Sequence, residues 1–568
     1  MIKYKEYGLC MTGMLKNDNC KIDMASICEI ATPAFYKNYT DLKSLLADIV
    51  RESEKRIKIY AHNLNYTGKY IISELTAFGL TDTTGKEDTE KSFNYIYNAV
   101  TGFFRFHIVY GKKSIDIIDS KKMAPITITD IADMLGITDN DYTALNLKCV
   151  SAIVQLLNEE GMKKGTIGGS CLEYFKEKTK AAGRYYGQLF PDLTKIKSAN
   201  DHFKNVDEYI RASYHGGLCY VNPVYQNKII NNGTTIDRNA MYSSEMHSKS
   251  GNKYPYGLPM YTDNKSKIEK LLKIDNYYCF IYLSCNALKL KENRMPSIRP
   301  IEQGFMFTNK NEFVTEINAS KANREYINGK LIKPYFVMTE KDFLRFIDDY
   351  EIEKLNIIDC YYFNTVSGIF DEYVDYFQNK KQNARSKGER QIAKLGLNNL
   401  TGKFGARPEV KGYSFNNGIK ETEYTSTQKT LHVGIGSAIT SYARQNLIST
   451  IYNIGFDKFC YCDTDSVHFI GHDTKDVFID NKELGAWKIE REWTEARFIK
   501  QKIYIEGDKG NYDVTWAGLN KDGIKDIAND LNDGSRLIED LGAKPIIDKI
   551  RVATPDGYYF ESVQFNIK

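Results

Sequence analysis

Two carboxylates separated by a single residue interrupt an aromatic, strand-forming stretch of the chain. Within FCYCDTDSVHF, residues 459–469, Asp463 and Asp465 lie on either side of Thr464. Residues i and i+2 of a strand face the same way, so the two carboxylates would lie close together. Two ionised carboxylates beside aromatic side chains are unfavourable unless cations neutralise them. A pair of Mg²⁺ ions is the usual solution, and such a pair aligns the attacking and leaving oxygens of phosphoryl transfer.

The same segment permits a plainer interpretation. Asp-Thr-Asp is common in hairpin loops, where both carboxylates would be solvated and would carry no chemistry. Taken alone, the segment favours this polar turn over a functional site. Other stretches of the chain are needed to decide between the two.

Two further stretches carry residue types that suit a nucleotide. In TIDRNAMY, Asp237 ends an apolar run and Tyr242 follows five residues later. In RQIAKLGLNNLTGKFG, Arg390, Lys394 and Asn398 recur at four-residue spacing, which places them on one helix face. Two cations and an amide suit a triphosphate, although a basic helix face is by itself more often simply solvated. The three stretches together, in this order, are far more specific than any one of them.

The elements that must position these residues follow from the periodicity of the sequence. Residues 1 to about 175 mix strands such as KRIKIYAHNL and KKSIDIIDS with helices such as DLKSLLADIVRESEKR, which predicts an α/β domain. Residues 250–367 are rich in strands, and residues 368–404 have helical periodicity in two segments that end at glycines. The stretch IGSAITSYARQNLISTIYNIG predicts a helix just before the aspartate pair.

The composition is that of a globular protein. With 568 residues, 42% hydrophobic and 26% charged, the chain can bury a core without disulfides. No apolar run reaches transmembrane length and no secretory signal opens the chain, so we expect a cytoplasmic protein without membrane contact. Eleven cysteines without a CxxC pair predict free thiols rather than a disulfide framework or zinc site. A net charge of +4 permits basic grooves without demanding them.

These stretches carry a resemblance to a known family. DRNAMY resembles motif A of the family B DNA polymerases, KLGLNNLTGKFG resembles motif B, and YCDTDS matches motif C without a change. FIKQKIYIEG resembles the family's K-x-Y motif, and YHGG, residues 214–217, resembles the Y-x-G-G motif that links the exonuclease and polymerase parts. The chain is similar over nearly its whole length to the protein-primed branch found in small tailed phages and linear plasmids.

The resemblance implies roles for individual residues. Asp237, Asp463 and Asp465 would be catalytic and would hold two Mg²⁺ ions, for which Mn²⁺ could substitute, with the Arg238 carbonyl as a further ligand. Nucleotide contacts would come from Tyr242, Lys381, Arg390, Lys394 and Asn398. DNA contacts would come from Tyr214, Gly216, Gly217, Lys502 and Tyr504, and in the first domain from His62, Asn63 and Tyr66. Core packing is an equally good interpretation of Tyr214 and Tyr504.

The sequence also departs from the family pattern within the polymerase motifs. Ala240 stands where Ser is usual and Ser243 where Pro is usual. Thr401 replaces the Tyr of motif B, which in the family packs against the nascent base pair. This change bears on insertion fidelity and nucleotide affinity and leaves the metal chemistry untouched.

The larger departure lies in the first domain, where the family carries a 3′–5′ exonuclease that works through four acidic residues. Aligned by their settings, the four positions hold Leu9, Met11, Thr67 and Val150. Such side chains cannot balance the charge of two Mg²⁺ ions. We therefore expect a degenerate, inactive exonuclease domain in which His62, Asn63 and Tyr66 keep the part that grips single-stranded DNA. Asp23 and Glu29 are nearby acids that another alignment could recruit, although their spacing is wrong.

The expected fold is α+β and multidomain: a right-hand polymerase with palm, fingers and thumb, preceded by a ribonuclease-H-like α/β domain. The expected divisions are 1–178 for the exonuclease-like domain, 179–249 for the first part of the palm, 250–367 for an insertion that docks a priming protein and DNA, 368–405 for the fingers, 406–432 for a second, short insertion, 433–515 for the second part of the palm and 516–568 for the thumb.

The expected function is template-directed DNA synthesis that starts on a terminal protein and replicates a phage-like or linear-plasmid genome. The expected partners are a DNA primer-template, deoxynucleoside triphosphates and a terminal protein, and we expect a monomer. Two alternatives stay open: an inactive, nucleic-acid-binding homologue, and a reverse transcriptase or untemplated nucleotidyltransferase, which Thr401 keeps in play.

Overall fold

The structure is a computed structural model of the full chain. It describes residues 4–17, 19–98, 102–179, 184–298, 313–317, 326–327, 330–331, 335–406, 409–414, 420–425, 431–517, 524, 527–529, 531 and 546–565. Large parts of the predicted thumb and parts of both predicted insertions lie outside these ranges.

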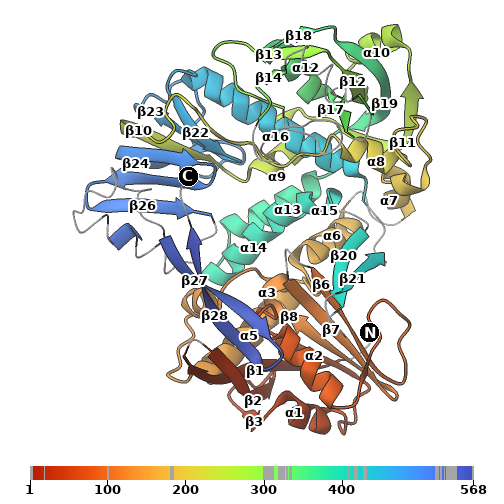
Figure 1. The fold of residues 1–568 in the computed structure, drawn as a ribbon, viewed down its shortest axis with the longest axis vertical. Coiled ribbons are helices and arrows are strands. Elements are labelled where there is room, and N and C mark those ends of the chain that lie inside the picture. The colour runs from red at the N-terminus through yellow and green to blue at the C-terminus, as the bar shows by residue number, and fades with distance from the viewer. Residues whose placement is uncertain are drawn as a thin grey trace.

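The N-terminal part is built on one large mixed sheet, at the lower end of the molecule in Figure 1. Strand β1 pairs in parallel with β4, and β4 pairs in parallel with β8, as the predicted α/β domain requires. The strands from this part are β1 (Lys5–Lys16), β2 (Asn19–Glu29), β3 (Tyr36–Tyr39), β4 (Arg56–Ala61), β5 (Thr81–Asp82), β6 (Lys91–Asn98), β7 (Gly102–Tyr110) and β8 (Lys113–Asp119).

Helices cover both faces of this sheet. Ile57 and Ile59 of β4 pack on one face with α1 (Leu42–Ile49) and α2 (Gly68–Ala77), whereas Tyr60 packs on the other face with α5 (Tyr142–Glu159). This alternation follows from the two-residue period of a strand. The helices α3 (Ser120–Met123) and α4 (Ile128–Leu135) connect β8 to α5.

A hairpin from the C-terminal end completes the N-terminal sheet. β27 (Ile546–Thr554) and β28 (Gly557–Phe565) form an antiparallel pair, and β28 continues the sheet along β2. Gly557 lies opposite Lys21, and a Cβ on Gly557 would collide with the carbonyl oxygen of Cys20. The two ends of the chain are therefore joined by a main-chain ladder.

The second large sheet is antiparallel throughout and has the order β26-β25-β24-β10-β23-β22-β9. Its strands are β9 (Cys219–Val221), β10 (Ile229–Arg238), β22 (Phe459–Asp463), β23 (Ser466–Ile470), β24 (Trp487–Lys500), β25 (Ile503–Asp508) and β26 (Asn511–Trp516). The long helix α16 (Val433–Ile454), as predicted, packs Leu447 and Ile451 against Ile236 and Val467 of this sheet.

Two antiparallel helices, α13 (Asp371–Gln382) and α14 (Lys387–Asn399), lie between the two sheets in Figure 1. They cross closely because Gly396 of α14 leaves room for the ring of Phe377 in α13. Their core is shared with Phe175 of α6 (Ile167–Lys178) and Phe404 of α15 (Thr401–Phe404). The linking helices are α7 (Arg184–Leu189), η1 (Leu193–Lys195), α8 (Val206–Arg211), α9 (Met241–Met246) and η2 (Ser248–Ser250).

The segment between α9 and α13 forms a strand-rich unit of its own, as predicted. Its main sheet has the order β11-β19-β12-β17, and a smaller one has the order β14-β13-β18. The elements are β11 (Tyr254–Thr262), α10 (Lys265–Leu271), β12 (Tyr277–Ser284), β13 (Ala287–Leu290), β14 (Glu316–Ile317), β15 (Tyr326–Ile327), β16 (Lys330–Leu331), β17 (Tyr335–Thr339), α12 (Glu340–Asp349), β18 (Tyr350–Glu353) and β19 (Asn356–Val366). A separate hairpin, β20 (Glu409–Ser414) and β21 (Lys420–Thr425), follows α15.

Within the described ranges, no helix combines the length and the apolar character needed to cross a lipid bilayer.

Candidate functional site

Strand β10 brings Asp237 to the turn that carries Asp463 and Asp465. β10 lies between β23 and β24, and its residue Asp237 is paired with Ser466 on one side and Lys488 on the other. The next backbone N–H, that of Arg238, donates to the carbonyl oxygen of Asp465 over 2.8 Å. Segments more than 200 residues apart in the sequence therefore meet at one edge of the sheet.

Asp463 and Asp465 lie in a hairpin turn and do not share a strand. Asp463 ends β22 and is paired with Ser466 at the start of β23, so Thr464 and Asp465 form the turn itself. Thr464 has the left-handed φ of 63° that such a tight reversal requires. The expectation of two carboxylates on one strand is wrong, because the chain reverses between them. The turn is not the solvated loop of the plainer interpretation, since both carboxylates are half-buried.

The carboxylates at this edge share one electrostatic field. Burial raises the pKa of Asp465 to about 6, and the negative charges of Asp237, Asp463 and Glu490 add to the effect. Two lysines offset part of this charge: Lys488 Nζ lies 3.0 Å from Asp237 Oδ1, and Lys502 Nζ lies 2.8 Å from Asp463 Oδ2.

Asp237, Asp463 and Asp465 supply carboxylate oxygens, which are the ligands that Mg²⁺ prefers. Their negative charges repel one another. The neighbouring negative charges add to burial in raising the pKa of Asp465, and a divalent cation would offset these charges. As the side chains lie, however, the described part of the chain holds no group of three or more His, Cys, Asp or Glu residues arranged around a metal position. Two of the three carboxylates are turned toward lysines instead.

Arg238 has a structural side chain beside this site. Its guanidinium is buried, forms an ion pair with Glu245 and donates to the carbonyl oxygen of Gly485 over 2.9 Å. These contacts fix the end of β10 against the loop before β24. The predicted metal ligand of Arg238 is its main-chain carbonyl oxygen, which these side-chain contacts do not involve.

A cationic helix face lies opposite the carboxylates. Arg390, Lys394 and Asn398 are exposed on α14, while Ile392 and Leu397 on its other side are buried. Burial lowers the pKa of Lys381 on α13, and the positive charges of Arg390, Lys394 and Lys488 lower it further, while Asp237 acts in the opposite sense. The charges of two other predicted triphosphate-binding residues and of Asp237, a predicted catalytic carboxylate, thus both act on Lys381.

Comparison with known proteins agrees with this geometry. The family described as DNA polymerase type B, organellar and viral, matches residues 138–484. The chain belongs to this family. The DNA polymerase of Bacillus phage M2 is 26% identical over 529 residues, covering 86% of this chain and 85% of the phage protein. The DNA polymerase of Bacillus phage phi29 is 25% identical over 540 residues, covering 88% and 86%.

A solved structure has the same fold. The phi29 DNA polymerase complexed with primer-template DNA and incoming nucleotide aligns over 100% of both chains with a TM-score of 0.82 at 22% identity. The predicted family resemblance and the predicted right-hand, multidomain α+β fold are confirmed. The assignment of the β10–β23–β24 sheet to the palm, and of α13 with α14 to the fingers, stays a prediction.

The departures from the motif pattern of the type B polymerases lie where α9 meets α14 and α15. Ser243 of α9 donates through Oγ to the carbonyl oxygen of Leu397 on α14 over 2.7 Å. Thr401 is buried, and its Oγ1 lies 3.3 Å from Met246 Sδ. Ala240 has a left-handed φ of 47° just before α9, and Tyr242 on that helix packs partly buried against the central core. Ser243 thus connects α9 to α14, and Thr401 connects α15 to α9.

The Y-x-G-G segment packs directly on the motif C turn. A Cβ on Gly217 would lie 2.6 Å from Thr464 Oγ1, and the Thr464 N–H donates to the carbonyl oxygen of Leu218 over 2.7 Å. A Cβ on Gly216 would meet open space, so that glycine lies at a surface. Tyr214 is half-buried, and its ring occupies the space beside Gly405. Both interpretations of Tyr214 therefore remain compatible with its position.

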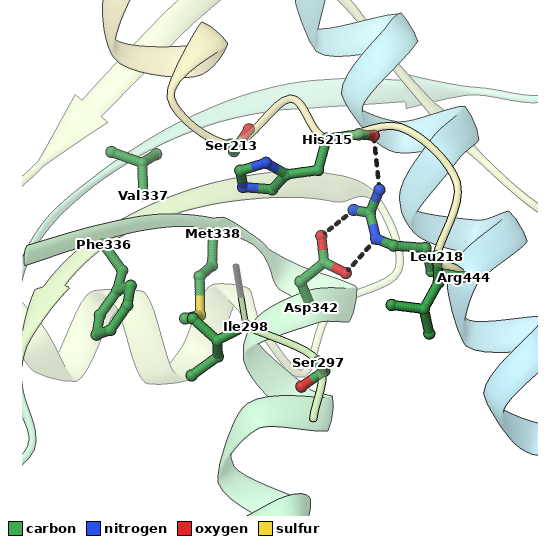
Figure 2. Close-up of a pocket in the computed structure, with 10 residues that line it drawn as sticks. All are labelled: Ser213, His215, Leu218, Ser297, Ile298, Phe336, Val337, Met338, Asp342 and Arg444. Carbon is green, nitrogen blue, oxygen red and sulfur yellow. Dashed lines mark hydrogen bonds and ion pairs between the residues drawn. The ribbon is translucent and has the colours of Figure 1, made fainter. Parts of the chain in front are cut away.

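A buried ion pair between Arg444 and Asp342 holds the backbone of this segment in place (Figure 2). Arg444 of α16 donates to the carbonyl oxygens of His215 and Gly216 over 2.7 and 3.0 Å, and Asp342 of α12 holds the guanidinium at 2.6 Å. The cavity that these residues line has a volume of about 30 Å³. It has room for about one water molecule and is no nucleotide site.

Lys502 and Tyr504 of the K-x-Y motif adjoin the same carboxylates. The Lys502 N–H donates to the Tyr461 hydroxyl over 2.9 Å, which directs the lysine toward Asp463. Tyr504 is half-buried, with its ring 5.0 Å from that of Tyr461. The structure thus gives Tyr504 a packing role beneath the site.

The structure does not bring the four predicted exonuclease positions together. Leu9 and Met11 pack on the sheet face covered by α1 and α2, whereas Val150 is a buried residue of α5, which covers the opposite face. The neighbours that point toward α5 are Gly8 and Cys10. A one-residue shift of β1 would exchange its two faces, so the assignment of the four positions stays a prediction. Thr67 precedes α2 without a side-chain capping bond.

No nearby acid replaces the missing carboxylates, whether β1 is aligned at Leu9 and Met11 or one residue away. Residues 8–12 of β1 include no carboxylate. Asp23 and Glu29 are exposed, and Glu29 is paired with Lys5 at 3.3 Å. Asp119 is buried and accepts the backbone N–H groups of Asn63 and Leu64, so it serves as a structural cap.

The predicted single-strand contacts lie close to the C-terminal hairpin. His62 is held by Ser120 Oγ at 3.0 Å, and burial lowers its pKa to about 4. Asn63 has a left-handed φ of 65°. The ring of Tyr66 lies 6.5 Å from that of Tyr558 at the tip of the β27–β28 hairpin. Tyr66 therefore faces the protein's own hairpin in this structure.

Sequence reasoning missed Lys488 and Glu490, which contribute charge to the site. Both lie on β24, Lys488 as the cross-strand partner of Asp237 and Glu490 at an irregularity of the β10–β24 ladder. The alternation of charged residues in WKIERE, 487–492, was the available signal. It could not be used without knowing that β24 lies beside β10.

Proposed function

We propose that this type B polymerase is a template-directed DNA polymerase that adds deoxynucleotides to a 3′-hydroxyl and releases pyrophosphate. The observation that carries the proposal is the gathering of Asp237, Asp463 and Asp465 at one edge of the palm, opposite the cationic face of α14. Membership of the family and the names of the relatives support it.

The carboxylates would bind metal ions and the cations would bind the triphosphate. Asp237 and Asp465 would hold two Mg²⁺ ions, with Asp463 and the Arg238 carbonyl as additional oxygen donors. When bound, the ions would stabilise the charge that develops on the attacking and leaving oxygens. Lys381, Arg390 and Lys394 would bind the triphosphate as fixed positive charges, and Asn398 would help to shape the pocket.

The remaining predicted residues would orient the other reactants. Tyr242 would lie beneath the incoming sugar, where its ring would exclude a 2′-hydroxyl. Lys502 and Tyr504 would steady the primer end. Tyr214, Gly216 and Gly217 would contact the template, the glycines through close approach of the backbone.

We further propose that the N-terminal domain no longer hydrolyses DNA and that synthesis starts on a hydroxyl of a terminal protein docked by residues 250–367. The absence of any carboxylate among residues 8–12, with Thr67 and Val150 at the other two positions, supports the first proposal. The family's protein-primed branch is the basis of the second.

A primer-extension assay tests the proposed synthesis and the proposed loss of hydrolysis. The full-length protein is incubated with an end-labelled primer on a DNA template, on an RNA template and without template, each with and without Mg²⁺. We expect extension on DNA with Mg²⁺ and no shortening of the primer when nucleotides are withheld. Extension without template would favour an untemplated transferase, extension on RNA alone a reverse transcriptase, and shortening an active exonuclease.

A further inference from the structure

Lys488 is a cation already placed at the proposed metal site. It lies directly across from Asp237 in the β10–β24 ladder, so the two side chains share one face of the sheet. The Nζ–Oδ1 distance is 3.0 Å, and the two side chains are 34% and 24% exposed, so the pair is partly shielded from water.

The ammonium of Lys488 lies in the field of more than one carboxylate. Burial opposes its charge, but the hydrogen bond that it donates to Asp237 and the negative charges of Glu490 and Asp465 raise its pKa. Glu490 lies two residues along the same strand, and its negative charge acts on the ammonium. Lysine carries its charge on a flexible stem, so the ammonium can leave Asp237 while remaining near Glu490.

We propose that Lys488 is a built-in counter-ion of Asp237 that a divalent cation must displace, and that it sets the cation concentration at which the site fills. The inference rests on the proposed function of Asp237 as a metal ligand. Without metal, Lys488 offsets charge beside Asp465; with metal, the ammonium and the cation compete for the same carboxylate oxygens. Lys488 acts through Asp237 and is a positioning residue.

Direct binding of Mn²⁺ to the full-length protein, measured from the EPR signal of the free ion without DNA or nucleotide, tests this inference. We expect Lys488→Met to bind Mn²⁺ about fivefold more tightly than the wild type, since one partner of a partly shielded ion pair is removed. Lys381→Met is the matched control, because Lys381 adds positive charge to the same field from α13. If both variants gained the same factor in Mn²⁺ affinity, Lys488 would act only as one positive charge among others. That result would overturn the inference.

A second measurement separates this inference from the proposed function. In EDTA, Lys488→Met leaves Asp237 without its counter-ion, so its melting temperature should fall, and Mg²⁺ should raise it by more than in the wild type. Lys482→Met, at an exposed position nearby, should behave as the wild type. Identical Mg²⁺ shifts in Lys488→Met and wild type would contradict the inference, whereas absence of ion binding in every variant would contradict the proposed function itself.

Discussion

At the scale of single residues, the site depends on contacts that hold a two-residue turn in place. Gly217 packs on the side chain of Thr464, whose left-handed conformation forms the reversal between Asp463 and Asp465. The aspartates were recognisable in the sequence because their spacing is short and local. The contact with Gly217 was not, because it joins segments that only the folded sheet brings together.

The double substitution at this contact gives a sharp prediction. Gly217→Ala should lower the rate of primer extension at least tenfold, because its Cβ would lie 2.6 Å from Thr464 Oγ1 and displace the turn. In a Thr464→Gly background the space is free, so the same change should have little effect, and glycine suits the left-handed φ. Extension rates of the four proteins measure the coupling; equal effects in both backgrounds would refute the contact.

His432 gives a pH-dependent prediction at the same scale. The side chain is fully buried against Phe363 and Phe190, and burial lowers its pKa to about 4. A histidine whose pKa is lower in the folded protein than in the unfolded chain reduces stability as the pH falls below about 6.5. The loss approaches about 3 kcal/mol near pH 4, because each pH unit below the pKa of the unfolded chain removes about 1.4 kcal/mol.

His432→Phe should remove this part of the acid sensitivity. Urea unfolding between pH 4 and pH 8 measures it, and the variant should gain stability relative to the wild type as the pH falls. His472→Phe, which removes an exposed histidine, is the control for the substitution itself. A parallel pH dependence in His432→Phe and wild type would contradict the assignment.

At the scale of elements, the sequence predicted the helices well and the strand partners poorly. The helix over 433–454 and the two helical segments of 371–399 follow from local periodicity and from Ser386, which caps α14. The neighbours of β10 could not be predicted, since β23 and β24 come from more than 200 residues later. For that reason Asp237 was recognised while its partner Lys488 was missed.

The crossing of α13 and α14 offers a prediction for the fingers. Gly396→Ala should destabilise the protein by about 1–3 kcal/mol, because the Cβ would overlap the ring of Phe377. Helix propensity alone predicts the opposite sign, a gain of about 1 kcal/mol. Gly402→Ala in α15 is the matched control, since a Cβ there meets open space and should not destabilise. Urea unfolding of both variants decides, and a stabilised Gly396→Ala would contradict the packing.

At the scale of the whole molecule, the C-terminal hairpin β27–β28 joins the N-terminal sheet by main-chain hydrogen bonds. The Ile22 N–H donates to the carbonyl oxygen of Asp556 over 2.9 Å, and Gly557 fits against Cys20 only without a side chain. No local pattern of residues indicates this pairing, since ladders between distant strands depend on backbone geometry and on little that is local. The exonuclease-like domain therefore anchors the hairpin whatever its own catalytic state.

A weaker pairing between β28 and β2 should be visible as faster hydrogen exchange of the backbone amides. Gly557→Val would force a Cβ against the Cys20 carbonyl, so the amides of β2 in residues 19–22 should exchange at least tenfold faster. Exchange in β4 and β8, which lie inside the same sheet, is the internal control and should stay as in the wild type. Unchanged protection of residues 19–22 would show that the ladder does not depend on this glycine.

The carboxylates at the motif C turn are proposed to hold the metal ions of nucleotide addition, so the extension rate of Asp465→Asn is the decisive measurement. This change removes the charge at nearly constant volume, whereas Asp473→Asn removes an exposed carboxylate farther along the chain. Single-turnover primer extension on a DNA template with Mg²⁺, together with primer-template binding, should be measured for both. We expect Asp465→Asn to lose at least about a hundredfold in rate while binding is kept, and Asp473→Asn to match the wild type. Extension by Asp465→Asn at the wild-type rate would contradict the account.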